Sequence, residues 1–209
     1  MSVIELKNVN KNYGEKLVLE NINIGIDEGE FIGIKGKSGR GKTTLLNIIG
    51  LQETFEGEYY FDGKKVDLND KKTIRSLLKE QVGYLFQNFA LIDDENVYEN
   101  LSIVMDKKKK NREGAMIDAL ELVGLNKDFL YQKIYKCSGG EQQRIAVARL
   151  ILKNCKVILA DEPTGSLDME NANLIMKLLT ELNEQGKTIV MVSHDDKMIS
   201  YCKRVIELS

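Results

Sequence analysis

The sequence predicts an α/β protein with a mainly parallel core sheet, an N-terminal antiparallel β subdomain and a helical subdomain. Three observations support this prediction. From residue 31 onwards, short continuous apolar runs alternate with helical patterns, which is typical of a parallel sheet covered on both faces. Alternating apolar and polar residues precede residue 31 and favour a half-solvated antiparallel sheet. Residues from about 88 to 136 change to helical patterns without strands.

The composition fits one folding unit and excludes several classes of protein. At 209 residues, with 43% hydrophobic and 30% charged residues, the chain suits one large domain or a domain with a subdomain. The net charge of −2 provides no basic field, so we expect no nucleic-acid partner. The chain has neither a long apolar run nor a signal-peptide pattern, so we expect a soluble protein that is not exported. Three widely spaced cysteines and one histidine favour reduced thiols over a zinc site.

The first elements belong to the expected antiparallel part. Strands are expected over residues 4–9 and 17–27, because the isoleucines of the second run alternate with asparagine and glycine. Residues 58–66 predict a hairpin that turns at Asp62-Gly63. Tyr13 is placed in the turn between the first two strands. It is either an ordinary loop aromatic or a ring that stacks on adenine.

The remaining elements alternate between apolar strands and helices. Ser138 and Glu141 form a capping-box pattern that opens one of the helices. The lysine run at residues 107–110 is read as a solvated loop rather than a binding patch. We expect a single domain over residues 1–209, with a helical subdomain of about 88–155 inserted in the core. The expected strands are 31–34, 82–86, 156–160, 188–192 and 203–208, and the expected helices are 44–49, 70–80, 96–105, 113–123, 142–152 and 171–183.

Residues 36–43 carry the clearest functional pattern. They fit G-x-x-x-x-G-K-[ST], the phosphate-binding P-loop, between an expected strand and an expected helix. The loop's N–H groups and the positive helix end would hold the β-phosphate of a nucleotide. Lys42 would reach the β- and γ-phosphates, and the Thr43 hydroxyl would ligate Mg²⁺. The expected nucleotide-binding residues here are Gly36, Lys37, Ser38, Gly39, Arg40, Gly41, Lys42, Thr43 and Thr44.

Polar residues follow the carboxyl ends of four expected strands. The phosphate loop, Gln87, the pair Asp161-Glu162 and His194 each lie at such an end, where open α/β sheets bind their ligands. We therefore expect one site, in which Asp161 holds Mg²⁺ and Glu162 is the base that polarises the attacking water. The alternative for the two carboxylates is a helix cap or an ion-pair network. His194 is either a structural hydrogen-bonding residue or a catalytic contact to the γ-phosphate.

Together these motifs resemble the ordered set found in ABC-transporter ATPase subunits, a family of P-loop NTPases. The set consists of the P-loop, Gln87, the Ser-Gly-Gly signature at residues 138–144, the strand that ends in Asp161-Glu162, the Ser-Leu-Asp at 166–168 and His194. The resemblance covers essentially the whole chain, and the combination of signature, P-loop and later histidine is highly specific.

Two segments narrow the resemblance. Residues 161–168 (DEPTGSLD) are similar to the macrolide-efflux and lipoprotein-release branch. Residues 86–91 (FQNFAL) and the short chain further resemble ATPases of Gram-positive bacteriocin or antimicrobial-peptide exporters. The resemblance implies an ATP-hydrolysing motor that energises export of a peptide-like or amphipathic substrate through a separate membrane subunit. An ATPase that gates a membrane signalling or cell-wall-remodelling complex without transport is the alternative.

The resemblance also implies partners and residue roles. Two copies would face each other head to tail, with ATP between the P-loop of one and Ser138, Gly139, Gly140 and Glu141 of the other. A helix that begins in Ser-Gly-Gly offers bare N–H groups to a γ-phosphate, which agrees with that role. Tyr13 would stack on adenine, Gln87 would sense Mg²⁺ and the transporter, and Asp168 would bridge the subunits. The helical subdomain would grip an integral membrane permease, which would place the protein at the inner face of the cell membrane.

The sequence departs from the family pattern at two places. Cys137 stands where the family usually has leucine, and the chain ends at Ser209 without the usual C-terminal tail. Cys137 precedes a helix start, so it is either a reactive thiolate or a small packing residue. A DNA-associated ATPase of the chromosome-maintenance kind shares the signature. The interval between Gln87 and Ser138 has neither the heptad arms nor the cysteine hook that such a protein needs.

Overall fold

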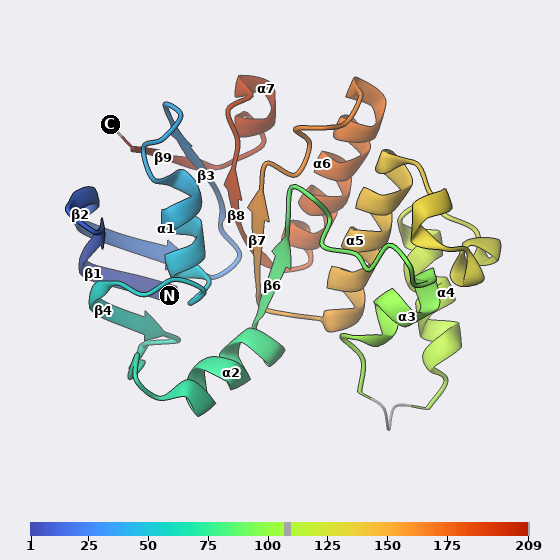
Figure 1. Cartoon of the computed structure of the whole chain (residues 1–209), viewed down its shortest axis with the longest axis horizontal. Coiled ribbons are helices and arrows are strands. Elements are labelled where there is room, and N and C mark those ends of the chain that lie inside the picture. The colour runs from blue at the N-terminus through green and yellow to red at the C-terminus, as the bar shows by residue number, and fades with distance from the viewer. Residues whose placement is uncertain (107–109, 209) are drawn as a thin grey trace.

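The computed structural model describes residues 1–106 and 110–208. Its strands are β1 (Ser2–Tyr13), β2 (Lys16–Asp27), β3 (Phe31–Gly36), β4 (Glu56–Phe61), β5 (Lys64–Lys65), β6 (Val82–Leu85), β7 (Val157–Asp161), β8 (Thr188–Val192) and β9 (Arg204–Leu208). They form a parallel sheet in the order β6-β7-β8-β3-β9 and an antiparallel sheet in the order β2-β1-β4-β5 (Figure 1). The predicted α/β class, with a parallel core sheet and an N-terminal antiparallel sheet, is confirmed.

The helices agree with the sequence patterns, with shifted ends. They are α1 (Lys42–Ile49), α2 (Lys71–Glu80), α3 (Val97–Ser102), α4 (Arg112–Leu122), α5 (Gly139–Lys153), α6 (Met169–Glu184) and the short α7 (Asp196–Ile199), which was not predicted. In the described residues, no helix has both the length and the apolar character that crossing a bilayer requires. Of the lysine run expected to be a solvated loop, only Lys110 is described, and it is exposed.

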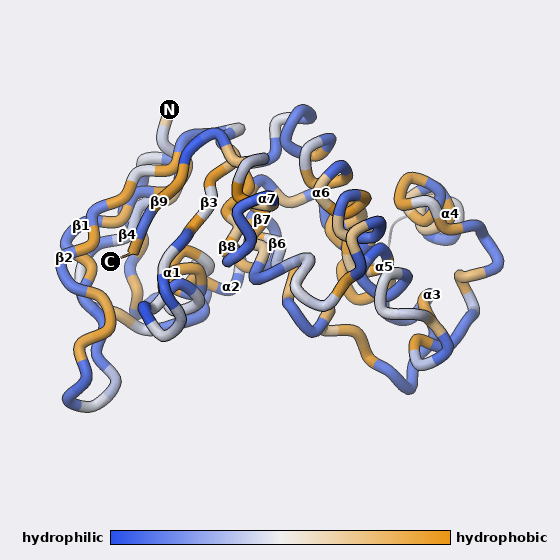
Figure 2. Tube along the Cα trace, turned by 90° about the horizontal axis from the view of Figure 1, so that it is seen from above, coloured by the Kyte–Doolittle hydropathy of each residue, from blue (hydrophilic) through white to orange (hydrophobic). Residues whose placement is uncertain are grey.

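The parallel strands other than the edge strand β9 are largely apolar because both faces of the sheet are covered there, whereas β9 is mostly exposed. All five residues of β8 are buried. Ile189 and Met191 point to the core cluster that contains α5 and α6, whereas Val190 and Val192 point to the cluster that contains α1 and the antiparallel sheet. Figure 2 shows hydrophobic segments along the strands of both sheets. Because both faces are buried, the polar groups of these strands gather at the strand ends.

The antiparallel sheet shows the predicted alternation. Along β2, Ile22 and Ile24 are half-buried and Ile26 is buried, whereas Asn21 and Asn23 are exposed. The hairpin of β4 and β5 turns at Asp62 (φ 47°) and Gly63 (φ 72°), and an Asp-Gly pair accommodates left-handed backbone at both positions. This sheet therefore packs one face against the core and leaves the other to solvent.

The region between β6 and β7 contains α3, α4, two short 3₁₀ turns (Lys127–Tyr131 and Ile134–Lys136) and α5. An apolar stripe along α4 is buried in the same cluster as α5, and the described residues of this region form short helices rather than coiled-coil arms. α3 ends at Ser102 instead of the expected Met105. The Ser102 carbonyl accepts from the Met105 N–H (3.2 Å) in a turn and from the Arg112 guanidinium (3.3 Å), so it has partners without another turn of α-helix. The stripe consists of Met116, Ala119, Leu120 and Val123.

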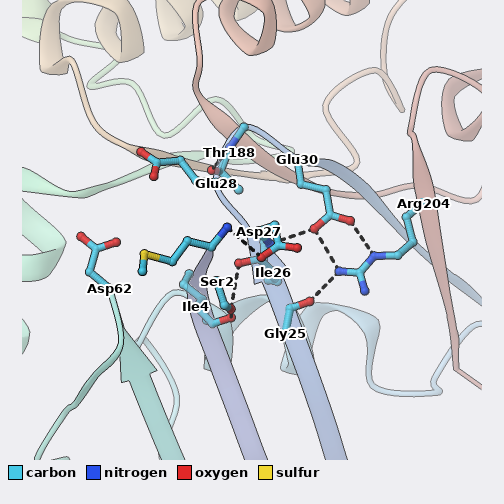
Figure 3. Close-up of polar contacts among 12 residues, drawn as sticks. Ser2, Ile4, Gly25, Ile26, Asp27, Glu28, Glu30, Asp62, Thr188 and Arg204 are labelled. Carbon is cyan, nitrogen blue, oxygen red and sulfur yellow. Dashed lines mark hydrogen bonds and ion pairs between the residues drawn. The ribbon is translucent and has the colours of Figure 1, made fainter.

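Arg204 of β9 ties the two sheets together (Figure 3). Its Nε lies 2.7 Å from Glu30 Oε1, and its Nη2 donates to Glu30 Oε2 (3.1 Å) and to the Gly25 carbonyl of β2 (2.6 Å). Glu30 also accepts from the backbone N–H of Asp27 (2.9 Å), and its side chain is only 18% exposed. The ion pair between Arg204 and Glu30 is stronger than an ordinary surface ion pair because it is bidentate and partly buried.

We therefore expect Arg204→Ala to lower the free energy of unfolding by about 1–2 kcal/mol, because it leaves the Glu30 carboxylate without its charged partner. Urea unfolding followed by circular dichroism measures the change. Lys177→Ala is the matched control, since it removes an exposed i,i+4 pair with Glu181 (3.8 Å) and should cost less than about 0.5 kcal/mol. Equal losses in the two variants would contradict the assignment.

Candidate nucleotide-binding site

A cavity of about 540 Å³ opens at the carboxyl ends of β3, β6, β7 and β8. The structure brings Gln87, Asp161 and Glu162 together there with the phosphate loop, as the strand-end argument predicted, whereas His194 does not line the cavity. Gly36, Lys37 and Arg40 belong to the same phosphate loop but do not line the cavity. The lining residues are Tyr13, Lys16, Val18, Ser38, Gly39, Gly41, Lys42, Thr43, Thr44, Gln87, Asp161, Glu162 and Val192.

The phosphate loop presents an uncapped helix start to this cavity. Gly41 precedes α1 with φ 85°, and a Cβ there would approach Val18 Cγ1 to 2.8 Å, so the position requires glycine. No side chain caps α1, and its first turn contains no acidic residue. Lys42 Nζ donates to the carbonyls of Gly36 (2.8 Å) and Lys37 (3.1 Å), which holds the ammonium against the loop. Free N–H groups, the helix dipole and this charge suit a phosphate.

Oxygen-bearing side chains from three elements line the cavity beside the loop. Thr43 Oγ1 donates to Asp161 Oδ1 (3.4 Å), and Gln87 lines the same cavity. Burial raises the pKa of the Asp161 carboxyl, and the charge of Glu162 raises it further, although Thr43 and Lys42 oppose the shift. A hydroxyl, a carboxylate and an amide are hard donors that suit Mg²⁺. The described part of the chain has no cluster of three or more His, Cys, Asp or Glu side chains that could hold a metal without a substrate.

Glu162 and His194 face each other at the end of β7 and β8. His194 Nδ1 lies 2.9 Å from Glu162 Oε1, and hydrogen bonding to Glu162, with its charge, raises the pKa of His194. Glu162 has φ 45°, an uncommon conformation for a non-glycine residue, and its side chain is only 16% exposed. Its N–H donates to the Val192 carbonyl (3.0 Å). Neither Asp161 nor Glu162 caps a helix, and the Glu162 carboxylate has a hydrogen-bond contact to His194, which is an ion pair when the imidazole is protonated.

The signature segment lies outside this cavity. Ser138 caps α5 and forms the predicted capping box, in which Glu141 Oε2 accepts from the Ser138 N–H (2.7 Å). Asp168 caps α6 through Asn171, whose side chain lies against Gly140. Asn171 therefore lies next to both the signature and Asp168. The phosphate cavity of this chain is lined by none of the five predicted residues Ser138, Gly139, Gly140, Glu141 and Asp168.

Sequence reasoning missed several residues that line or support the site. Lys16 and Val18 line the cavity, and their position beside Tyr13 at the start of β2 is the signal that could have identified them. Tyr13 itself ends β1 rather than lying in the turn. Buried Gln143 donates to the Pro163 carbonyl (2.6 Å), directly after Glu162. Arg149 donates to the carbonyls of Phe89 (2.8 Å) and Ala90 (2.6 Å), close in sequence to Gln87.

Cys137 is a packing residue in this structure. Its side chain is 6% exposed and belongs to the core cluster of α4 and α5. Burial raises the pKa of its thiol, and a hydrogen bond from Gln132 (3.5 Å) only opposes this shift. Burial therefore favours the packing-residue interpretation of Cys137 over the reactive thiolate, because an accessible sulfur is a condition of reactivity.

We expect Cys137 in the folded protein to react with iodoacetamide at least about tenfold more slowly than an exposed thiol, because the residue is buried and burial also raises the pKa of its thiol. Mass spectrometry gives the rate for each cysteine, and ATP should not change it. The internal controls are buried Cys155, whose thiol pKa burial also raises, and half-buried Cys202, whose thiol pKa burial raises to about 12. Rapid labelling that ATP slows would restore the reactive-thiolate hypothesis.

Comparisons with known proteins find similar chains. Residues 19–165 match a family model described as "ABC transporter". The chain is 42% identical to the macrolide export ATP-binding/permease protein MacB of Campylobacter jejuni, with 99% of this chain covered. It is 40% identical to the ABC transporter ATP-binding protein MJ0796 of Methanocaldococcus jannaschii, covering 99% of this chain and 93% of that protein. The alignment with MacB covers only 33% of that longer protein.

The structural comparison gives the same result. A dimeric, post-hydrolysis structure of the ATP-binding cassette MJ0796, bound to ADP and Pi, superposes with a TM-score of 0.88 and 38% identity. The superposition covers 99% of this chain and 94% of that one. CbiO1 from Clostridium perfringens, part of the ABC transporter complex cbiONQ, superposes with a TM-score of 0.87 and 28% identity.

Proposed function

The chain belongs to the ABC transporter family of ATP-binding ATPases, and from this membership we propose that it is the ATP-hydrolysing motor of a membrane export complex. One observation carries the proposal. The phosphate loop, Gln87, Asp161 and Glu162 converge on one cavity, while the signature at the start of α5 stays outside it. Such a half-site needs a second copy to complete it.

The residues of the cavity have separate tasks toward ATP. The loop N–H groups and Lys42 bind the β- and γ-phosphates, with Ser38, Gly39, Gly41 and Thr44 lining their path. Thr43, Gln87 and Asp161 are the residues that would hold Mg²⁺, since hard oxygen donors on one cavity wall fit that ion. When bound, Mg²⁺ neutralises phosphate charge.

Glu162 and His194 act on the water that attacks ATP. The Glu162 carboxylate accepts a proton from the attacking water while the oxygen of that water forms a bond to the γ-phosphorus. The bond to the bridging oxygen breaks, and its electron pair leaves with ADP. His194 holds the carboxylate in place through the 2.9 Å contact, and its exposed ring is available to the γ-phosphate.

The second copy would supply the remaining contacts. In a head-to-tail homodimer, Ser138, Gly139 and Gly140 of one subunit face the γ-phosphate at the other subunit's loop, with Glu141 holding Ser138 in its capping box. Asp168, which caps α6 beside the signature, would bridge the two chains. The dimeric form of the similar cassette MJ0796 supports this assembly. Tyr13 would stack on the adenine.

The membrane partner would be a separate integral permease, docked on a helical subdomain of about residues 88–155. The protein would then be cytoplasmic and peripheral on the inner face of the membrane. The name of MacB, a macrolide export ATP-binding/permease protein, supports export as the direction. The FQNFAL segment at 86–91 supports a peptide-like, bacteriocin-like or amphipathic substrate. The chain as a whole is proposed to form one domain around the parallel sheet.

The test combines co-purification with transport. The chain is expressed with its neighbouring permease, isolated as a complex and reconstituted in vesicles, and ATP hydrolysis is measured with candidate peptides and with macrolides. Peptide-stimulated hydrolysis with ATP-dependent movement of the peptide supports the proposal. Hydrolysis that is coupled to no substrate, but that controls a signalling or cell-wall enzyme, would assign the gating alternative instead.

A further inference from the structure

Lys11 is nearly buried on β1, although a lysine side chain seldom is. It is 8% exposed, and a buried ammonium is costly unless it is paired. Its Nζ donates to Glu53 Oε1 (2.8 Å) and to the carbonyl of Thr54 (2.7 Å), with a longer contact to the Thr54 hydroxyl (3.4 Å). The same ammonium lies 4.6 Å from the centroid of the Tyr13 ring. Lys11 therefore makes both a cation–π contact with Tyr13 and an ion pair with Glu53.

Glu53 closes the arrangement from the other side. Its second oxygen, Oε2, accepts from the Tyr13 hydroxyl (2.7 Å). The hydrogen bond from Lys11, and next the one from Tyr13, lowers the pKa of the Glu53 carboxyl, so the acceptor stays ionised. Glu53 lies in the segment after α1, the helix that follows the phosphate loop. Lys11 and Glu53 thus tie the end of β1 to the segment that follows α1.

This arrangement fixes how Tyr13 meets the cavity. The ring lines the cavity and is 49% exposed, while the ammonium covers one of its faces and the hydroxyl is held at the far end. Only the opposite face can receive a flat ligand. A free tyrosine would lose side-chain freedom when it stacked, whereas this one is already held.

We propose that Lys11 and Glu53 are positioning residues that hold the Tyr13 ring ready to stack on the adenine of ATP. The inference rests on the proposed nucleotide-binding function and deepens it, because it assigns two residues, 42 positions apart in the sequence, to recognition of the base rather than of the phosphates. Neither residue lines the cavity, so each acts through Tyr13.

The antiparallel sheet contains a matched control for this arrangement. Lys7 lies 4.7 Å from the Tyr60 ring centroid, and the Tyr60 hydroxyl donates to Glu58 Oε2 (2.8 Å). The same three residue types therefore meet a second time on the same sheet. Tyr60 does not line the cavity, and Lys7 is not buried. Any general effect of breaking such a contact on the sheet will appear in both places, whereas an effect on adenine will appear only at Tyr13.

The experiment compares two ligands, ATP and inorganic tripolyphosphate, by calorimetric titration of the full chain. Tyr13→Phe keeps the ring and removes the hydroxyl, and Glu53→Ala removes the acceptor. We expect each variant to bind ATP about three- to tenfold more weakly and tripolyphosphate as well as the parent does. The double variant should bind ATP no more weakly than the weaker-binding single variant, because both changes break the same contact between Tyr13 and Glu53.

Two further variants guard against loss of folding. Glu53→Gln can accept from Lys11 with its amide oxygen and donate to the Tyr13 hydroxyl with its amide nitrogen, so it should bind ATP nearly as the parent does. Tyr60→Phe and Glu58→Ala should leave ATP affinity unchanged. Parental ATP affinity in Tyr13→Phe and Glu53→Ala, or an equal loss for tripolyphosphate, would overturn the inference. If the parent chain bound no ATP, or if Lys42→Ala bound it equally well, the proposed function itself would fail.

Discussion

Replacing Glu162 by glutamine is expected to lower ATP turnover by a factor of about 10² or more while ATP binding persists. Glutamine keeps the size of the side chain, and its amide oxygen can still accept from His194, so the 2.9 Å contact need not be lost. What it loses is the ability to take a proton from water. Because the nucleotide is then held without being hydrolysed, we also expect an ATP-bound dimer to accumulate.

Two measurements check this result. Phosphate release gives the turnover, and size-exclusion chromatography with and without ATP gives the dimer. Glu181→Gln is the matched control, because it makes the same chemical change on the exposed side of α6, near the end of that helix. Near-parental turnover in Glu162→Gln would remove Glu162 from its role as the base. A large loss in the control would show that the assay reports something other than the site.

Most of the fold could be predicted because its signals are local. A few neighbouring residues are enough to predict the half-buried strand β2, the fully buried strand β8 and the turn at Asp62-Gly63. The shorter α3 could not be predicted in this way. It ends at Ser102, whose carbonyl accepts from the Met105 N–H and from Arg112, ten residues later, and no periodic pattern contains the second contact.

The site followed from the sequence to the extent that it depends on strand ends. The phosphate loop, Gln87, Asp161 and Glu162 meet because parallel strands bring their carboxyl ends to one edge. The residues that hold these groups in place were missed, because they come from other elements. Lys11 reaches Glu53 across 42 residues, and the interpretation of Cys137 depended on burial that the adjacent helix start did not reveal.

The helix α5 connects both loops of the cavity. Gln143 donates to the Pro163 carbonyl, next to Glu162, and Arg149 holds the carbonyls of Phe89 and Ala90. Phe89 and Ala90 have φ of 62° and 46°, a conformation that costs energy for residues other than glycine, so these bonds stabilise a strained turn. The same helix begins at the signature. An event at the signature end is therefore connected through α5 to the loops that carry Gln87 and Glu162.

Mixing two inactive variants is expected to restore ATP hydrolysis if each site is built from two chains. Lys42→Ala removes the ammonium that the phosphate loop holds. Gly139→Glu places a negative charge at the start of α5, where a Cβ would meet no atom within 4 Å, and leaves the Ser138 cap intact. An acidic residue in the first helical turn also favours folding, so the lesion is confined to phosphate binding.

Each variant alone should lose at least about 10²-fold in turnover, because both of its sites carry a lesion. A heterodimer instead contains one site with both lesions and one intact site. An equal mixture should therefore recover about a quarter of the parental rate if the two sites act independently, since half of the dimers are mixed. ATP turnover is measured after mixing, with heterodimers counted by differently tagged chains. Mixed dimers that form but hydrolyse no ATP would exclude a site completed by the partner's signature. A recovery that is seen without mixed dimers would mean that the restored rate does not come from a shared site.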